Sequence, residues 1–369
     1  MTVSLRPHIA YFVTPHGYGH AARAVAVMEA LLRHRRDVHF EIFTRVPAWF
    51  FSSCPPDAYD YHGVWTDVGL VQRTALSEDI PATVERLAQF MPFEDDLVSG
   101  LAARLRETAC RLVLCDIAPL GIAVARAAGI PSVLVENFTW DHIYAGYIED
   151  DRRLRWYVDY LADLFADADH RIQAGPACQY HPGWLTTAPI SRASRTSAEL
   201  VREQLGVPRR APMVLVTMGG FSWDYGFLDA LAARPDVFFV VPGGRDRPSG
   251  AVDRPPNVIC LPHHSTFFHP DLVNSSDVVI SKVGYSTVAE VYWAGCALGY
   301  VPRPRFRESD VLVEFVAREM SGLPVSAVEF DTADWLNRLD DLLAMPRRVH
   351  AGPNGAEQAA EFVASLLTG

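Results

Sequence analysis

The chain has 369 residues, 49% of them hydrophobic and 21% charged, and its 33 basic and 44 acidic residues leave a formal net charge of −11. This length exceeds what one hydrophobic core usually fills, so we expect two domains. The negative charge argues against a nucleic-acid partner and favours a small ligand. The sequence has neither an apolar stretch of about 18 residues nor a signal-peptide pattern, so we expect no membrane span.

The six cysteines favour a reduced, cytoplasmic protein. They form no Cys-x-x-Cys pair, and the two Cys-x-x-His pairs, Cys178 with His181 and Cys260 with His263, lack a second pair at zinc-finger spacing. No Asp-x-Asp motif stands in a suitable loop after a predicted strand. We therefore expect no metal and no cofactor.

Short apolar runs alternate with helical patterns along the first half of the chain. Such alternation is typical of a parallel sheet covered by helices on both faces. The expected elements are strands at 9–13, 38–43, 112–115 and 131–135 and helices at 21–33 and 121–128.

The same alternation restarts in the second half, after a stretch rich in Pro, Ser, Thr and Arg that contains one short helix at 197–205. The sequence thus predicts an α/β protein with two doubly wound, Rossmann-like domains, whose parallel sheets face a central cleft that binds ligands at the carboxyl ends of the strands. The second-half strands are expected at 213–217, 237–241, 258–261, 278–281 and 298–301. The predicted divisions are a first domain at 1–190, a linker at 191–212, a second domain at 213–350 and a closing helix at 351–369.

The first strand runs into His16-Gly-Tyr-Gly-His20, which fits neither the dinucleotide fingerprint nor the phosphate-binding loop of nucleotide hydrolases. The glycines allow a tight turn and a close approach of the backbone to a ligand. His20, in the first turn of a helix, could act as a general base if a carboxylate orients it, although a lone histidine is more often structural. Asp116, which follows the strand at 112–115, could be that carboxylate or could cap the next helix.

The second domain has two candidate anion-binding loops. Gly219 and Gly220 follow its first strand, and the stretch from Lys282 to Thr287 supplies a glycine, hydroxyls and a cation at a helix N-terminus. Glu290, one turn later, could accept hydrogen bonds from a ribose diol or could form a capping box with Thr287.

Aromatic and polar side chains follow other predicted strands. Asn137 and Trp140 would suit a polyhydroxylated ligand, although Trp140 could equally be core. Tyr18, Trp140 and Tyr144 would form the rim of such a site. His263 follows another strand, where a loop could present backbone groups to a nucleobase.

Two segments of the sequence, HGYGHAARAVAVMEAL and SKVGYSTVAEVYWAGCALGYVPRPRFRESDVLVEFV, resemble the GT-B glycosyltransferases related to the N-acetylglucosaminyltransferase of peptidoglycan synthesis. A closer likeness runs through DVGLVQRTAL, CDIAPLGIAVARAAGIPSV and ENFTWDHIYAGYI, which look like the glycosyltransferase-like N-terminal part of plant L-arabinokinases. The kinase domain of those proteins has no counterpart among these residues.

The resemblance implies a GT-B fold and a role for each candidate residue. His20 would deprotonate the acceptor, and Asp116 would hold His20. The donor-binding residues implied are Gly219, Gly220, Ser286, Thr287, Glu290 and Glu308, the last contacting the donor sugar, although the Asp-Gln pair usual in plant enzymes is absent there. The sequence pattern adds His263 and Gly284 to the expected donor-binding residues. The acceptor-binding residues expected are His16, Tyr18, Gln72, Asn137 and Trp140.

These observations predict an inverting, metal-independent glycosyltransferase that moves a sugar from a nucleotide-sugar, by resemblance a UDP-sugar, to a hydroxyl of a small-molecule acceptor. Two alternatives stay open, because fold does not determine function. One is a nucleotide-sugar hydrolase or epimerase, and the other is a non-catalytic sugar-nucleotide-binding partner of a sugar kinase.

Overall fold

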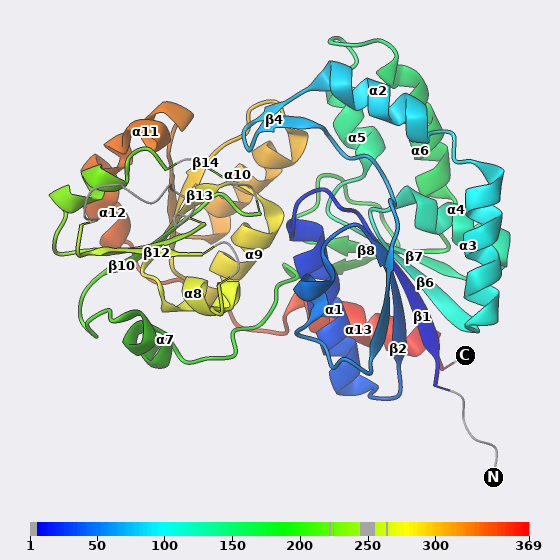
Figure 1. The fold of residues 1–369 in the computed structure, drawn as a ribbon, viewed down its shortest axis with the longest axis horizontal. Coiled ribbons are helices and arrows are strands. Elements are labelled where there is room, and N and C mark those ends of the chain that lie inside the picture. Colours follow the sequence, from blue (N-terminus) through cyan, green and yellow to red (C-terminus); the bar gives the residue numbers. More distant parts are fainter. Residues whose placement is uncertain (1–5, 221–222, 224, 244–254, 263–264, 369) are drawn as a thin grey trace. The chain divides into compact units, whose positions relative to one another are not determined.

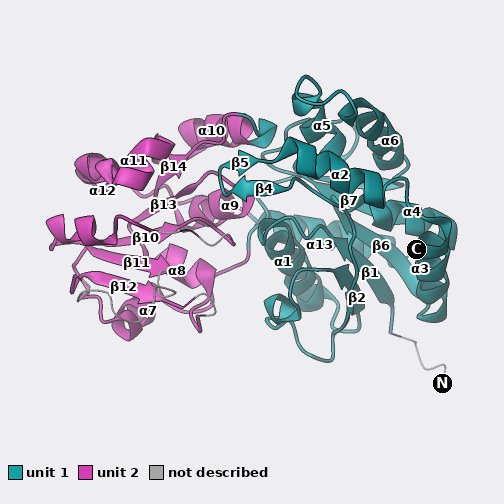
Figure 2. Cartoon of the chain, turned by 45° about the horizontal axis from the view of Figure 1, so that its top comes forward, with its two compact units in different colours: residues 1–191, 305–308, 353–369 teal, residues 192–304, 309–352 magenta. Residues whose placement is uncertain are grey.

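The computed structural model describes residues 6–220, 223, 225–243, 255–262 and 265–368 (Figure 1). The chain forms two compact units, which Figure 2 distinguishes by colour. Unit 1 comprises Met1–Ser191, Arg305–Glu308 and Pro353–Gly369, and unit 2 comprises Arg192–Pro304 and Ser309–Gly352. The predicted linker therefore lies almost entirely within unit 2, and the closing helix within unit 1.

Unit 1 is built on a seven-stranded parallel sheet with the strand order β3-β2-β1-β6-β7-β8-β9. Five of the six residues of β1 are buried, as expected for a strand covered on both faces. The strands are β1 (His8–Val13), β2 (His39–Thr44), β3 (Tyr59–Gly63), β6 (Cys110–Asp116), β7 (Ser132–Glu136), β8 (His170–Ala174) and β9 (Leu185–Thr187). A separate antiparallel pair joins β4 (Gln72–Thr74) to β5 (Ser77–Glu78).

Helices cover both faces of this sheet. Ala10 and Phe12 of β1 belong to the apolar cluster that includes residues of α2, α3, α4 and α6, whereas α1 packs against α13 (Figure 1). Gly121 allows α4 to lie close to the strands, because a Cβ there would come within 2.7 Å of Phe12 and 2.6 Å of the Cys115 sulfur. The helices are α1 (Gly19–His34), α2 (Ile80–Phe90), α3 (Asp95–Glu107), α4 (Pro119–Ala128), α5 (Trp140–Tyr144), α6 (Leu154–Ala166) and α13 (Gly355–Leu366).

Unit 2 contains a six-stranded parallel sheet with the order β12-β11-β10-β13-β14-β15. The strands are β10 (Met213–Thr217), β11 (Phe238–Pro242), β12 (Val258–Leu261), β13 (Val278–Lys282), β14 (Ala297–Val301) and β15 (Gly322–Pro324). The helices are α7 (Ala198–Leu205), α8 (His269–Ser275), α9 (Tyr285–Ala294), α10 (Arg307–Glu319), α11 (Ala327–Thr332) and α12 (Leu339–Leu343), and the first two residues of α10 fall in unit 1. The predicted α/β class with two parallel sheets is confirmed.

Two further observations concern the chain as a whole. All six cysteines, which fall within the described residues, are free thiols. None of the described helices combines the length and the apolar character that a bilayer crossing requires.

Candidate functional site

His20 and Asp116 lie within hydrogen-bonding distance at the carboxyl ends of two neighbouring strands. His20 is the second residue of α1, which follows β1, and Asp116 ends β6, where it pairs in register with Val13 of β1. The Nδ1 atom of His20 is 2.9 Å from Oδ1 of Asp116, and both side chains are buried. The structure thus contains the pair that the sequence predicted.

Asp116 does not cap the following helix. The N-cap position of α4 is Ala118, which makes no side-chain capping bond. The capping interpretation of Asp116 is therefore wrong, because both oxygens of its carboxylate form hydrogen bonds with side chains of α1.

Arg23, which the sequence analysis did not select, completes this group. Its guanidinium donates to both oxygens of Asp116, from Nε at 2.8 Å and from Nη2 at 2.6 Å, and its side chain is only 1% exposed. Arg23 stands three residues after His20, so both face the same side of α1. The available signal was one arginine within the otherwise apolar, alanine-rich stretch 21–28 of the predicted helix.

The contacts around Asp116 determine which nitrogen of His20 carries the proton. Burial alone would raise the pKa of Asp116, but the charge and hydrogen bonds of Arg23, together with the bond to His20, outweigh it and hold the pKa below its usual value. Asp116 is therefore a carboxylate, and its Oδ1 accepts a hydrogen bond from Nδ1–H of His20. Nη2 of Arg23 lies farther from the same nitrogen, at 3.2 Å. This arrangement leaves Nε2 of His20 as a proton acceptor.

Asn137 and Glu308 extend the network. The Asn137 side chain accepts a bond of 2.5 Å from Nη1 of Arg23 and donates one of 2.6 Å to Oε1 of Glu308. Glu308, predicted as a donor-sugar contact of the second domain, belongs to unit 1 and is buried. Its role toward a sugar stays a prediction.

Two aromatic side chains expected at the rim of the acceptor site are core residues. Trp140 and Tyr144 are fully buried and stacked on each other, with ring centroids 5.7 Å apart. Burial is possible because each polar atom has a partner: the indole of Trp140 donates to Asp67 and the hydroxyl of Tyr144 donates to the carbonyl of Gly69. The rim interpretation of these two residues is wrong.

The other acceptor candidates lie in the loops after β1 and in β4. The ring of His16 lies edge-on to Trp140 at 5.1 Å, and Tyr18 is partly buried and stacks on Phe50 at 5.2 Å. The side-chain amide atoms of Gln72 are buried and make no hydrogen bond to any described residue. An unpaired buried amide costs free energy, so a conformational adjustment that gives Gln72 a partner would be favourable.

Asp67 is a second buried carboxylate in this region that sequence reasoning missed. It accepts hydrogen bonds from the hydroxyl of Thr14 at 2.7 Å and from the indole of Trp140 at 3.0 Å. Burial outweighs these bonds and, with the nearby charge of Asp116, raises the pKa of Asp67 to about 7. Asp67 therefore changes protonation near neutral pH.

In unit 2 the predicted anion-binding loops meet at neighbouring strand ends. Thr217 of β10 pairs with Ser281 of β13, and Gly219, with φ +69°, lies close enough that a Cβ there would be 3.7 Å from Cε of Lys282. Gly284 is the N-cap of α9, so this loop runs directly into a helix N-terminus, the kind of position that favours an anion. Gly220 follows Gly219 in the loop after β10, Ser286 and Thr287 lie in the first turn of α9, and His263 lies outside the described residues.

Glu290 does not form a capping box with Thr287, because α9 begins at Tyr285 and Glu290 lies in its middle. Its two oxygens instead contact Nη2 of Arg192 at 2.9 Å and Nδ1 of His269 at 2.7 Å. Burial alone would raise the pKa of Glu290, but these two neighbours hold it below its usual value. A role in ribose binding stays a prediction.

Comparison of the sequence with known proteins gives one informative relative. No family model matches the chain. The L-arabinokinase of Arabidopsis thaliana is 26% identical over 370 residues, which cover 98% of this chain and 34% of that protein. The chain thus spans about a third of the length of the curated relative it matches, and the predicted likeness to L-arabinokinases is confirmed.

Comparison of the structure gives glycosyltransferases. The calicheamicin glycosyltransferase CalG4 superimposes with a TM-score of 0.67 at 16% identity, covering 98% of this chain and 99% of that one. A UDP-glucosyltransferase of Polygonum tinctorium that glucosylates indoxyl gives 0.63 at 15% identity, covering all of both chains. The chain therefore has the GT-B fold of glycosyltransferases, as its sequence resemblance predicted.

Proposed function

We propose that the chain is an inverting glycosyltransferase that transfers a sugar from a nucleotide-sugar, specifically a UDP-sugar, to a hydroxyl group of a small-molecule acceptor. The observation that carries the proposal is the pairing of His20 with Asp116 at 2.9 Å, at the carboxyl ends of β1 and β6. The fold supports it, since the solved structures that this chain resembles are glycosyltransferases. UDP is proposed as the nucleotide because one of these similar structures is a UDP-glucosyltransferase.

The chemistry at unit 1 is proton transfer. Nε2 of His20 takes the proton of the acceptor hydroxyl as its oxygen bonds to the anomeric carbon, and the bond between that carbon and the diphosphate oxygen breaks on the opposite side. The configuration at the anomeric carbon inverts. Asp116 stabilises the imidazolium that forms, and Arg23 keeps Asp116 ionised and fixed in position.

The chemistry at unit 2 is stabilisation of the leaving nucleoside diphosphate. The first-turn N–H groups of α9, the backbone at Gly219 and Gly220 and the cation of Lys282 supply positive charge without a metal ion. The nucleotide-sugar is then a co-substrate, and no cofactor takes part.

The first test is ligand binding. We expect the Tm of the purified chain to rise with one series of nucleoside diphosphates and their sugars, because a ligand that binds only the folded state stabilises it. If no member of a panel covering all common bases shifts the Tm, the donor-site proposal is wrong.

The second test is the variant His20→Ala. We expect turnover to fall by about 10²–10⁴-fold, because the general base is lost. Affinity for the nucleoside diphosphate should stay unchanged, since the groups proposed to bind the diphosphate lie in unit 2. His34→Ala, at the other end of α1, is the matched control and should leave turnover unchanged. Equal turnover in His20→Ala and the wild type would remove His20 from the mechanism.

A second candidate function is a non-catalytic sugar-nucleotide-binding partner of a sugar kinase. The likeness to part of an L-arabinokinase favours it. It predicts nucleotide-sugar binding without turnover on any acceptor. A hydrolase or epimerase differs from both, because it would consume the nucleotide-sugar without an acceptor.

A further inference from the structure

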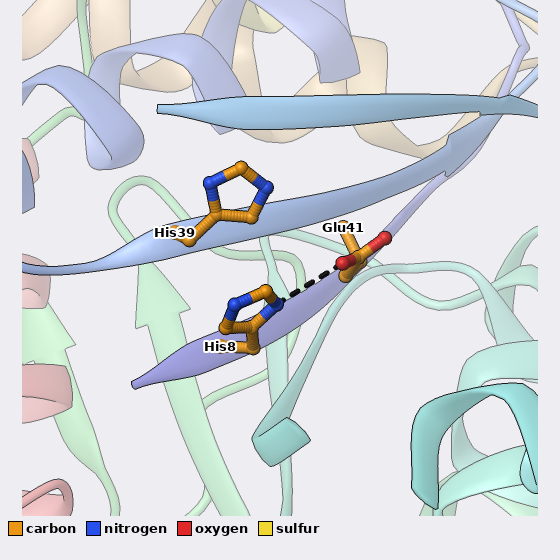
Figure 3. Close-up of side chains that lie close together, drawn as sticks. All are labelled: His8, His39 and Glu41. Carbon is orange, nitrogen blue, oxygen red and sulfur yellow. Dashed lines mark hydrogen bonds and ion pairs between the residues drawn. The ribbon is translucent and has the colours of Figure 1, made fainter. Parts of the chain in front are cut away.

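Three strands of unit 1 carry histidine and carboxylate side chains on one face near their amino ends. His8 is the first residue of β1 and pairs in register with His39, the first residue of β2. Glu41 lies two residues after His39, and alternate residues of a strand face the same side. Asp60 of β3 is the register partner of Glu41, and His62 lies two residues farther on. Figure 3 shows three of them, His8, His39 and Glu41, gathered on this face.

The three side chains are close enough to share one cation. One ligand atom from each of His8, His39 and Glu41 lies within 4.8 Å of the others. Nδ1 of His8 is 3.1 Å from Oε1 of Glu41, and the two imidazole centroids are 4.6 Å apart. Tetrahedral ligands of Zn²⁺ lie roughly 3.4 Å from one another, so the His8–Glu41 distance already fits and the His39 ring needs a shift of about 1–1.5 Å.

Burial and charge favour a cation at this point. The side chain of Glu41 is only 3% exposed, whereas His8 and His39 are 28% and 12% exposed and leave a route for an ion. Both oxygens of Glu41 contact imidazoles: Oε1 contacts His8, and Oε2 contacts Nε2 of His62 at 2.6 Å. A buried carboxylate is usually balanced by a full positive charge or by a metal ion, and a divalent ion would supply that charge here.

The surrounding groups would hold the ligands in position. His62 binds Oε2 of Glu41 and so directs Oε1 toward His8. Asp60, at 3.0 Å from Nε2 of His39, adds a second negative charge beside the cluster. Such partners of metal ligands contribute measurably to metal affinity.

We propose that His8, His39 and Glu41 bind one divalent transition-metal ion, with two imidazole nitrogens and one carboxylate oxygen as protein ligands. This donor set suits Zn²⁺, which takes His and carboxylate ligands in tetrahedral sites and would complete its coordination with water. The ion would join β1 to β2 at the ends of the strands opposite to His20 and Asp116. Its role is therefore to stabilise the pairing of β1 with β2 at the amino ends of these strands, not to take part in sugar transfer.

The test uses the purified full chain, freed of metal with a chelator and titrated calorimetrically with Zn²⁺ alone. We expect one Zn²⁺ per chain and a rise in Tm that depends on the Zn²⁺ concentration. His39→Gln and the double variant His8→Gln/His39→Gln should each lose at least about 100-fold in affinity, and Asp60→Asn about tenfold. The replaced side chains are partly exposed, so these variants should fold, which circular dichroism checks.

His34→Gln is the matched control, because His34 also contacts a carboxylate, that of Glu357 at 2.9 Å, outside the cluster. It should bind Zn²⁺ as the wild type does. Near-ultraviolet and visible absorption of the Co²⁺ form distinguishes nitrogen and oxygen ligands from cysteine ligands, since thiolates add an intense charge-transfer band in the near ultraviolet. Absence of stoichiometric binding, a thiolate band, or equal affinity in the wild type and the double variant would overturn the proposal.

Discussion

Arg23 is the residue on which the His20–Asp116 pair depends. Replacing it with Met would leave the Asp116 carboxylate fully buried with only one partner, and breaking a buried ion pair from one side costs about 3–5 kcal/mol. We expect Arg23→Met to lower the free energy of unfolding by that amount in denaturant titrations. Arg23→Lys keeps the positive charge but cannot donate to both oxygens of Asp116 in the same geometry. Its free energy of unfolding should lie between those of the Met variant and the wild type. A Met variant within about 1 kcal/mol of the wild type would show that Arg23 does not support Asp116.

Asp67 predicts a particular pH dependence. Its pKa is about 7 in the folded chain, against the ordinary value of 3.8 for an aspartate, so the folded state holds the proton more tightly. Its contribution to stability is then fully present below about pH 4 and is lost as the pH rises through 7, a change of up to about 4 kcal/mol. We expect the wild type to lose stability relative to Asp67→Asn as the pH rises from about 4 to 7, measured as the difference between their free energies of unfolding. A difference independent of pH would contradict the raised pKa.

At the residue scale the sequence predicted the His20–Asp116 pair but not the buried charged residues that surround it. His20 and Asp116 were predictable because both follow buried strands, and the carboxyl ends of parallel strands share one edge. Arg23 and Asp67 were not, because a charged side chain is normally exposed and only the three-dimensional register supplies the partners that allow its burial. Trp140 was placed at a rim for the same reason: its partner, Asp67, is 73 residues away.

At the scale of single elements, predictability followed burial. β10 and β12 match the predicted ranges at both ends, because buried parallel strands are continuous apolar runs. β3 was not predicted: it lies at an edge of its sheet, and its sequence YDYHG carries polar residues that need no burial there. The capping box considered for Thr287 and Glu290 does not form, because α9 begins at Tyr285 with Gly284 as its N-cap, so Thr287 is already inside the helix.

Gly219, in the loop after β10, allows a matched test of the proposed anion site, because Gly206 has a similar backbone conformation outside that site. Gly219 has φ +69° and Gly206, the C-cap of α7, has φ +72°, and a Cβ at Gly206 would meet nothing within 4 Å. Replacing either with Ala should cost about 1–2 kcal/mol of stability through the left-handed backbone. Only Gly219→Ala should also weaken nucleoside diphosphate binding, by about tenfold or more, in calorimetric titrations. Equal affinity in the two variants would separate Gly219 from the donor site.

For the whole molecule, hydrogen exchange can measure which of the two units binds the nucleotide. The proposed donor groups, at the ends of β10 and β13 and in the first turn of α9, all belong to unit 2, whereas His20, Arg23 and Asp116 belong to unit 1. Because a bound anion pairs with backbone N–H groups, those amides should exchange hydrogen more slowly. We expect a nucleoside diphosphate to slow exchange most in peptides covering 217–220 and 282–290.

The same experiment contains its control. Peptides from α1 and β6 in unit 1 report on any general stabilisation of the chain, and the wild type should show less protection there than around α9. Gly219→Ala should lose the protection at 217–220 and 282–290 at a nucleotide concentration that saturates the wild type, whereas Gly206→Ala should keep it. Protection centred on 14–23 and 112–116 instead would place the nucleotide in unit 1. His20 would then contact the leaving group, and the assignment of the donor to α9 would be wrong even if the chain transfers sugar.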